Sequence, residues 1–149
     1  MSGDYAAWNY FPTIQTPQNR AFLDRFHARY GPQRLLTDPM EASYFGVHLW
    51  AQAVAAAGSD DVRATRQAIK NQSFQAPEGL VRIDPQTQHT WKTVRIGKMT
   101  DDGHFEIIYC SEGPIRPIPY PPSRSQAEWE SFLAELYQRW GGHWANPGG

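Results

Sequence analysis

The segment GDYAAWNYFPTIQTPQNRAF (residues 3–22) opens the fold, because its two halves predict a strand followed at once by a helix. The first half holds the aromatic residues Tyr5, Trp8, Tyr10 and Phe11. Aromatic side chains suit a pleated, half-buried surface, and Pro12 cannot continue a strand ladder. Thr16 followed by Pro17 is typical of a helix start, with threonine as the N-cap. We therefore expect a strand over residues 5–11 and a helix over residues 17–30.

Two further helices are predicted after this segment. Asp38 before Pro39, with Glu41 three residues later, has the form of a capping box at the start of a helix over residues 38–57. The spacing of Met40, Tyr44, Val47 and Val54 predicts that these residues form its packed face. Gly58 is a suitable stop, and a third helix is expected over residues 60–70.

The second half of the chain has the pattern of strands. Residues 80–83 predict a short strand, and residues 90–99 and 104–109 flank Asp101-Asp102-Gly103, a hairpin signal. Residues 113–122 hold five prolines and should be extended without ladder bonds. Ser125 and Glu128 form a second capping-box pattern, which opens a last helix. The order indicates a mixed α/β protein whose opening strand has no partner nearby in sequence.

Composition excludes several classes of protein. The chain has 149 residues and a net charge of -1, which argues against a nucleic-acid partner, since such proteins need a clustered cationic surface. No apolar run approaches the roughly 18–20 residues of a membrane span. Cys110 is the single cysteine, so an intrachain disulfide framework is excluded. The N-terminal residues have neither the basic nor the apolar region of a signal peptide.

Catalytic motifs are weak. His104 and Glu106 match half of a zinc-deaminase pattern but lack the cysteines that complete it. Cys110 follows an apolar run, with no sign of the base that a nucleophile needs. A small hydrolase using these residues is therefore the least favoured hypothesis. We expect no enzyme, no metal site and no cofactor.

The aromatic segment is the best candidate for binding. In a strand, Trp8 and Tyr10 share one face and Asn9 lies on the other. Aromatic rings with a few amides and hydroxyls suit a cleft for a small polar ligand, although a strand simply buried against helices has the same composition. We predict Trp8, Asn9 and Tyr10 as ligand-binding candidates.

Four motifs together carry a family resemblance. They are GDYAAWNYFPTIQTPQNRAF (3–22), TDPMEASYFGVHLWAQAV (37–54), QAPEGLVRID (75–84) and GPIRPIPY (113–120). In this order they resemble the urea- and short-chain-amide-binding proteins of bacterial ABC transporters, which belong to the branched-chain amino acid-binding, type 1 periplasmic binding proteins. The ending AEWESFLAELYQRWGGHWANPG (127–148) is similar to the tail of the urea-binding members.

The resemblance implies a fold and a division of the chain. Family members have two α/β lobes joined by three crossing segments, and this chain resembles their C-terminal portion only. Residues 1–16 would be a strand of lobe 2 and a hinge crossing, and residues 17–89 would be helices and a strand of lobe 1. Residues 90–149 would supply a crossing, the edge hairpin of lobe 2 and the C-terminal helix. We therefore expect a fragment of a longer protein.

The resemblance also implies a function. The chain would be part of a periplasmic solute-binding protein that delivers urea or a short-chain amide to the permease subunits of an ABC transporter. Most ligand contacts in the family come from upstream positions, so binding is expected only in the full-length parent. The alternative is a cytoplasmic amide-sensing regulator of the same fold.

Overall fold

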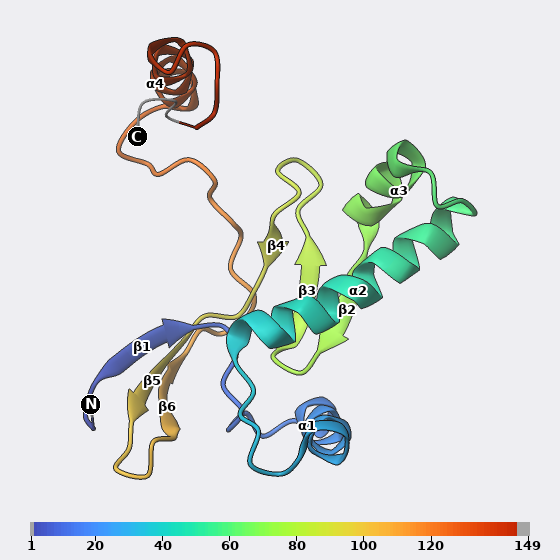
Figure 1. Cartoon of the computed structure of the whole chain (residues 1–149), viewed down its shortest axis with the longest axis vertical. Coiled ribbons are helices and arrows are strands. Elements are labelled where there is room, and N and C mark those ends of the chain that lie inside the picture. The colour runs from blue at the N-terminus through green and yellow to red at the C-terminus, as the bar shows by residue number, and fades with distance from the viewer. Residues whose placement is uncertain (1, 146–149) are drawn as a thin grey trace. The chain divides into compact units, whose positions relative to one another are not determined.

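The computed structural model describes residues 2–145 and divides the chain into two compact units, Met1–Pro117 and Ile118–Gly149. Within the first unit the strands form two separate three-stranded sheets, and helices accompany them (Figure 1). The fold is therefore the mixed α/β type that the sequence predicts. Each unit is described by itself below.

The first sheet has the strand order β1-β5-β6 and is antiparallel throughout. It contains β1 (Tyr5–Trp8), β5 (Arg95–Met99) and β6 (Phe105–Cys110). The β5–β6 hairpin confirms the turn predicted at Gly103, whose φ is 81°. The opening strand has no partner nearby in sequence, as predicted, but it does have a distant partner in this sheet. Tyr5 pairs with Lys98 and Trp8 with Arg95, so the partner of β1 lies about ninety residues further along the chain.

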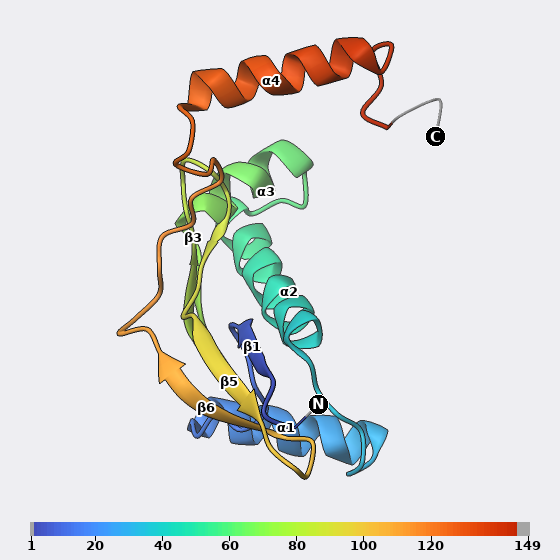
Figure 2. The same cartoon turned by 90° about the vertical axis from the view of Figure 1, so that its left-hand side faces the viewer.

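The second sheet has the order β2-β3-β4 and lies beside the helix α2 (Asp38–Ala57) (Figures 1 and 2). Its strands are β2 (Ser73–Ala76), β3 (Gly79–Ile83) and β4 (Thr90–Trp91). β3 confirms the strand predicted at residues 80–83, whereas β2 was not predicted. Phe45 and Leu49 of α2 form a buried cluster with Ala76 and Val81 of this sheet. The helix and the sheet therefore share one core.

The first two helices begin where the sequence predicts, whereas the third begins two residues later than expected. Thr16 caps α1 (Pro17–Tyr30) by accepting a hydrogen bond from the backbone N–H of Asn19. The expected third helix is shorter than predicted, and consists of α3 (Val62–Ala68) and the 3-10 turn η1 (Ile69–Asn71). The helix α2 (Asp38–Ala57) is the longest of the described helices, as predicted. The capping box expected at its start is absent, since Thr37 occupies the cap position and makes no side-chain cap bond.

The packed face of α2 also differs from the prediction. The buried residues are Glu41, Phe45, Leu49 and Ala53, a strict four-residue stripe. Val47, which was expected in the core, is 65% exposed. Met40 and Tyr44 do pack, but against a second cluster formed by Tyr10, Ile14, Phe22 and Leu36. Because α2 touches two clusters on neighbouring faces, its apolar pattern does not define a single buried side.

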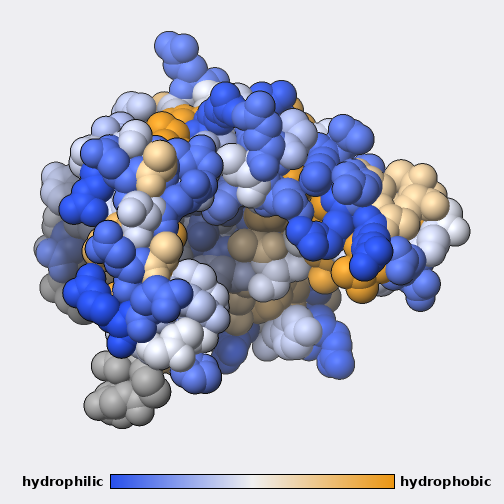
Figure 3. All heavy atoms as spheres, turned by 90° about the horizontal axis from the view of Figure 1, so that it is seen from above, coloured by the Kyte–Doolittle hydropathy of each residue, from blue (hydrophilic) through white to orange (hydrophobic). Residues whose placement is uncertain are grey.

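The second unit contains α4 (Gln126–Arg139). Both bonds of the predicted capping box are present, one from Glu128 N–H to the Ser125 hydroxyl and one from Ser125 N–H to the Glu128 carboxylate. Before the helix, the proline-rich segment contains no named strand, and Ile115 forms one isolated bridge with Lys92. The face seen in Figure 3 is mostly hydrophilic, with hydrophobic residues in separate patches. No helix over residues 2–145 is long and apolar enough to cross a membrane.

Candidate functional site

The chain leaves β1 through a turn held by the carboxylate of Asp38. Its Oδ1 atom accepts the backbone N–H of Tyr10 at 2.7 Å and that of Asn9 at 3.1 Å. These two donors would otherwise extend the strand, so β1 ends at Trp8 and not at residue 11 as predicted. Both bonds end on Oδ1, and neither uses Oδ2.

Asn9 joins this turn to the segment that leads into β5. Its side-chain amide donates to the Thr93 carbonyl at 2.9 Å, and its own carbonyl accepts a hydrogen bond from Arg95 Nη1 at 2.6 Å. The other terminal nitrogen of Arg95 donates to the Glu78 carbonyl at 2.7 Å. Charge-assisted bonds of this kind are the stronger ones in proteins. Arg95 therefore links the turn after β1 to the turn between β2 and β3.

A hollow of about 180 Å³ lies next to this turn. Its lining combines the end of β1 with the loop before α2 and the start of β6. The lining residues are Trp8, Tyr10, Phe11, Pro12, Leu36, Thr37, Asp38 and Phe105. Trp8 is 43% exposed, so its indole remains available to a ligand. The hollow is therefore a mainly apolar surface with a carboxylate at one side.

Tyr10 is more a structural residue than an accessible one. Its ring belongs to the buried cluster with Phe22, and its hydroxyl donates to Asn19 Oδ1 at 2.8 Å. Burial, and secondarily the charge of Glu41, raises the pKa of this hydroxyl above its usual range. The structure thus brings Trp8, Asn9 and Tyr10 together, but uses the polar groups of Asn9 and Tyr10 to hold the turn. Their role in ligand binding stays a prediction.

Sequence reasoning missed Asp38 and Arg95 as parts of this site. Asp38 was interpreted as a helix cap, because an aspartate before Pro39 is a strong cap signal. Its true partners, Asn9 and Tyr10, are distant in sequence. Arg95 shows no local signal at all, since it pairs with main-chain carbonyls from two other segments.

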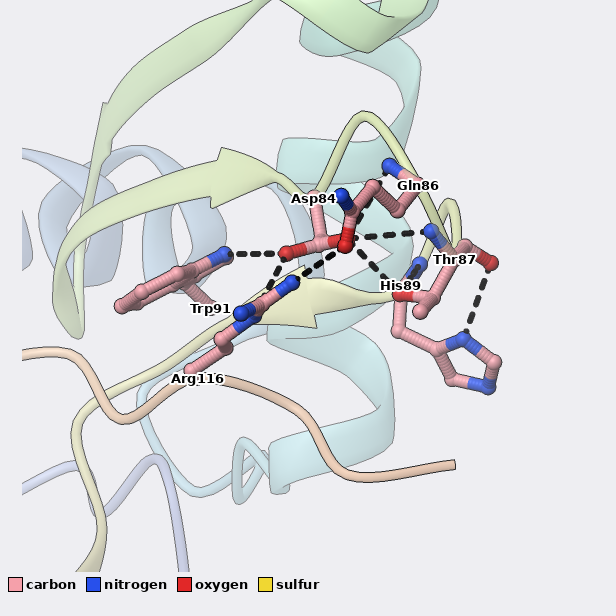
Figure 4. A network of polar contacts seen from close by, with 6 residues as sticks. All are labelled: Asp84, Gln86, Thr87, His89, Trp91 and Arg116. Carbon is pink, nitrogen blue, oxygen red and sulfur yellow. Dashed lines mark hydrogen bonds and ion pairs between the residues drawn. The ribbon is translucent and has the colours of Figure 1, made fainter. Parts of the chain in front are cut away.

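A second polar cluster surrounds Asp84 at the end of β3 (Figure 4). Asp84 Oδ1 accepts from the backbone N–H groups of Gln86 and Thr87, and from the Thr87 hydroxyl. Its Oδ2 accepts from Trp91 Nε1 at 3.1 Å and Arg116 Nε at 3.2 Å. These donors, the Thr87 backbone first, lower the pKa of Asp84 to about 2. Both oxygens of this carboxylate already accept hydrogen bonds from the protein and have none left for a ligand, so the cluster is structural.

The remaining chemical candidates do not assemble into a centre. Cys110 is exposed and its thiol donates to the Ser111 carbonyl. His104 and Glu106 lie at the other end of β6, beside the Gly103 turn. Over the described part of the chain, no three His, Cys, Asp or Glu side chains are grouped to hold a metal ion.

Residues 1–126 match the family described as "Periplasmic binding protein domain", and the chain belongs to this family. The family comprises the type 1 binding proteins that serve ABC transporters, and it binds solutes. Residues 127–149, including most of α4, lie outside the matched range.

Two proteins illustrate the similarity in sequence. The Leu/Ile/Val-binding protein homolog 6 of Brucella abortus is 26% identical over 106 residues, which are 69% of this chain and 27% of that protein. Limonene hydroxylase of Geobacillus stearothermophilus is 31% identical over 114 residues, or 76% of this chain and 21% of that protein. This chain therefore spans only about a quarter of the length of either relative.

Solved structures show the same fold. A solute-binding protein of an ABC transporter from Rhodopseudomonas palustris BisB5, in complex with 3,4-dihydroxybenzoic acid, has a TM-score of 0.68 at 21% identity. The match covers 78% of this chain and 32% of that one. Another from R. palustris, in complex with 4-hydroxybenzoate, has a TM-score of 0.65 at 26% identity, covering 76% and 32%. The structure is thus a part of the type 1 binding-protein fold.

Proposed function

We propose that this chain is the C-terminal part of an extracytoplasmic solute-binding protein that delivers urea or a short-chain amide to ABC permease subunits. The family supports solute binding, and the hollow beside Trp8 and Asp38 supports a small ligand with N–H groups. The solved relatives are named as solute-binding proteins of ABC transporters, which favours transport over an amide-sensing regulator.

Two lobes are the proposed framework for this function. Residues 1–16 contribute β1 to the sheet that β5 and β6 complete, and residues 17–89 hold α1 to α3 with β2 and β3. Residues 90–149 would cross back and end in α4. Because β4 pairs with β3, we propose that this crossing starts after Trp91 and not at residue 90. The turn held by Asp38 and Arg95 would then lie where lobes join.

The chemistry of the hollow favours an amide over a carboxylate at this position. Asp38 lines the hollow, and its Oδ2 atom is the proposed acceptor for an amide N–H2, because both backbone bonds end on Oδ1. The Trp8 ring offers an apolar wall for a methyl or ethyl group. A ligand carboxylate placed beside Asp38 would meet a like charge, which is unfavourable in a partly buried site.

Aromatic acids are the second candidate. The related structures from R. palustris hold benzoate derivatives, and most residues that line the hollow are apolar or aromatic. An aromatic acid would need its carboxylate turned away from Asp38, toward donors elsewhere in the proposed longer parent protein. Trp8 would then stack on the ligand ring.

Calorimetry on the longer parent protein tests the proposal. We expect it to bind urea, acetamide or formamide, and expect Trp8→Ala and Asp38→Asn each to weaken that affinity at least about tenfold, or about 1.4 kcal/mol. If the parent protein bound 4-hydroxybenzoate and none of the amides, the aromatic acid would become the proposed ligand. The 149-residue chain alone should bind none of them measurably, because an amide left unpaired on one side costs about 1–3 kcal/mol.

A further inference from the structure

Two glutamates are buried side by side in the first unit. Glu41 on α2 is 0% exposed, and Glu78 in the turn between β2 and β3 is 1% exposed. One oxygen of Glu41 accepts the backbone N–H of Glu78 at 3.3 Å, so the two residues are in direct contact. Glu41 Oε2 and Glu78 Oε1 have no hydrogen-bond partner among the described residues. Buried carboxylates in this state are costly unless they are paired or protonated.

One cation, Lys92, forms an ion pair with a member of this glutamate pair. Lys92 Nζ lies 3.2 Å from Glu78 Oε2, and the same ammonium lies 5.0 Å from the centre of the Phe45 ring. Arg95 is close by, but its guanidinium donates to main-chain carbonyls, including that of Glu78. Lys92 therefore pairs with Glu78 and not with Glu41, whose Oε2 has no hydrogen-bond partner among the described residues.

The charged groups around the Glu41–Glu78 pair come from three parts of the chain. Asp38 lies one turn earlier on α2, Glu78 lies in the β2–β3 turn, and Lys92 and Arg95 lie on the segment leading from β4 through β5. With all of them ionised, three carboxylates face two cations. One added proton makes the cluster neutral. The charge of Glu41 also raises the pKa of the Tyr10 hydroxyl, which stays neutral.

We propose that Glu41 is a proton-binding site, which holds one proton in the folded protein and thereby stabilises the junction between the two sheets. The location supports a structural consequence, because Lys92 follows β4 of the second sheet and Arg95 begins β5 of the first. Loss of the proton places an unpaired charge in this junction.

The direction of the pH effect follows from burial. Desolvation first, and then the charge of Glu78, raises the pKa of Glu41 from 4.5 to about 8. Desolvation also raises the pKa of Glu78 to about 7, against the opposing effect of Lys92. A group whose pKa is higher when folded stabilises the fold fully below its unfolded pKa. That contribution is lost as the pH rises from about 4.5 to about 8.

Denaturation by guanidinium chloride at several pH values tests this on the whole chain. Relative to Glu41→Gln, the unfolding equilibrium constant of the wild type should rise about tenfold per pH unit inside this window. Glu41→Gln should therefore be the more stable protein at pH 8.5. The matched control is Glu106→Gln, an exposed glutamate on β6, which should follow the wild type. An equal loss of stability in Glu41→Gln at every pH would overturn the proposal, since it would mean that Glu41 is ionised.

Infrared spectroscopy provides an independent readout that needs no stable Glu41 variant. At pH 7.5, between the pKa values of about 7 for Glu78 and about 8 for Glu41, the folded wild type should show the carbonyl stretch of a protonated, buried carboxylic acid that comes mainly from Glu41, because exposed carboxyl groups are then ionised. This band should persist in Glu78→Gln and lose most of its intensity in Glu41→Gln. A wild type without the band, or a band removed by Glu78→Gln alone, would contradict the assignment to Glu41.

Discussion

At the scale of single residues, substitution of Asp38 tests whether its carboxylate holds the turn after β1. Asp38→Ala removes the acceptor for two backbone N–H groups, and should lower the free energy of unfolding by about 1.5–3 kcal/mol, as for bonds to charged groups. Asp38→Asn keeps an acceptor and should lose less. Hydrogen exchange should quicken at Asn9 and Tyr10. Faster exchange only in the first turn of α2 would instead restore the capping interpretation.

Gly97 of β5 lies against two aromatic side chains. A Cβ atom at this position would lie 2.7 Å from Cζ of Phe11 and 3.1 Å from Cδ1 of Phe105. Phe11 is buried, so its ring has little room to move. We expect Gly97→Ala to lower the free energy of unfolding by about 1–3 kcal/mol, the usual cost of overpacking, as measured by chemical denaturation.

Gly46 is the matched control for that substitution. It lies inside α2, and an added Cβ atom would meet nothing within 4 Å. Gly46→Ala should raise the free energy of unfolding by about 0.5–1 kcal/mol, because alanine is the better helix former. If both alanines destabilised the protein equally, crowding around Phe11 would not explain the Gly97 result.

At the scale of elements, the capping box of α4 gives a direct prediction. Ser125→Ala removes the acceptor for Glu128 N–H and one partner of the Glu128 carboxylate, at a cost of about 0.5–2 kcal/mol of helix stability. Circular dichroism should show less helix. Ser123→Ala, two residues earlier and outside the helix, should leave the spectrum unchanged.

The elements also show where sequence reasoning succeeds. Helix starts at Thr16 and Ser125 were predicted correctly, because their bonds connect residues three apart. The hairpin at Gly103 was correct for the same local reason. Asp38 was interpreted wrongly because its partners lie nearly thirty residues away. β2 was missed because its Ser73–Ala76 stretch has little strand character of its own, and tertiary pairing with β3 determines it.

In the candidate site, too, residues with a local sequence signal were predicted and residues joined by the fold were not. The local aromatic run pointed to Trp8, which lines the hollow, and to Asn9 and Tyr10, which hold the turn beside it. Arg95, Glu78 and Glu41 form their contacts through the fold, so their spacing in sequence carries no signal. Buried polar residues of this kind become visible only when the sheets are assembled.

At the scale of the whole molecule, large apolar side chains remain exposed on the first sheet. Tyr5, Trp8, Ile108 and Tyr109 of β1 and β6 are all more than two-fifths exposed. Exposed apolar surface beside the free edges of a sheet favours association. Sedimentation velocity should show dimers or larger species that increase with protein concentration. A single monomeric species over the whole concentration range, with one sharp unfolding transition, would contradict this expectation.

The pairing of β1 with β5 has a consequence for how the chain is made. During synthesis on the ribosome, β1 emerges well before Arg95 of β5, a wait of about 5–20 s at ordinary rates of elongation. Local structure can form in that interval, since the hairpin of β2 and β3 and the helices need only near neighbours. The first sheet cannot form in that interval, because its pairing of β1 with β5 joins residues about ninety positions apart. Nascent β1 therefore has no partner in the first sheet until the residues of β5 have left the ribosome.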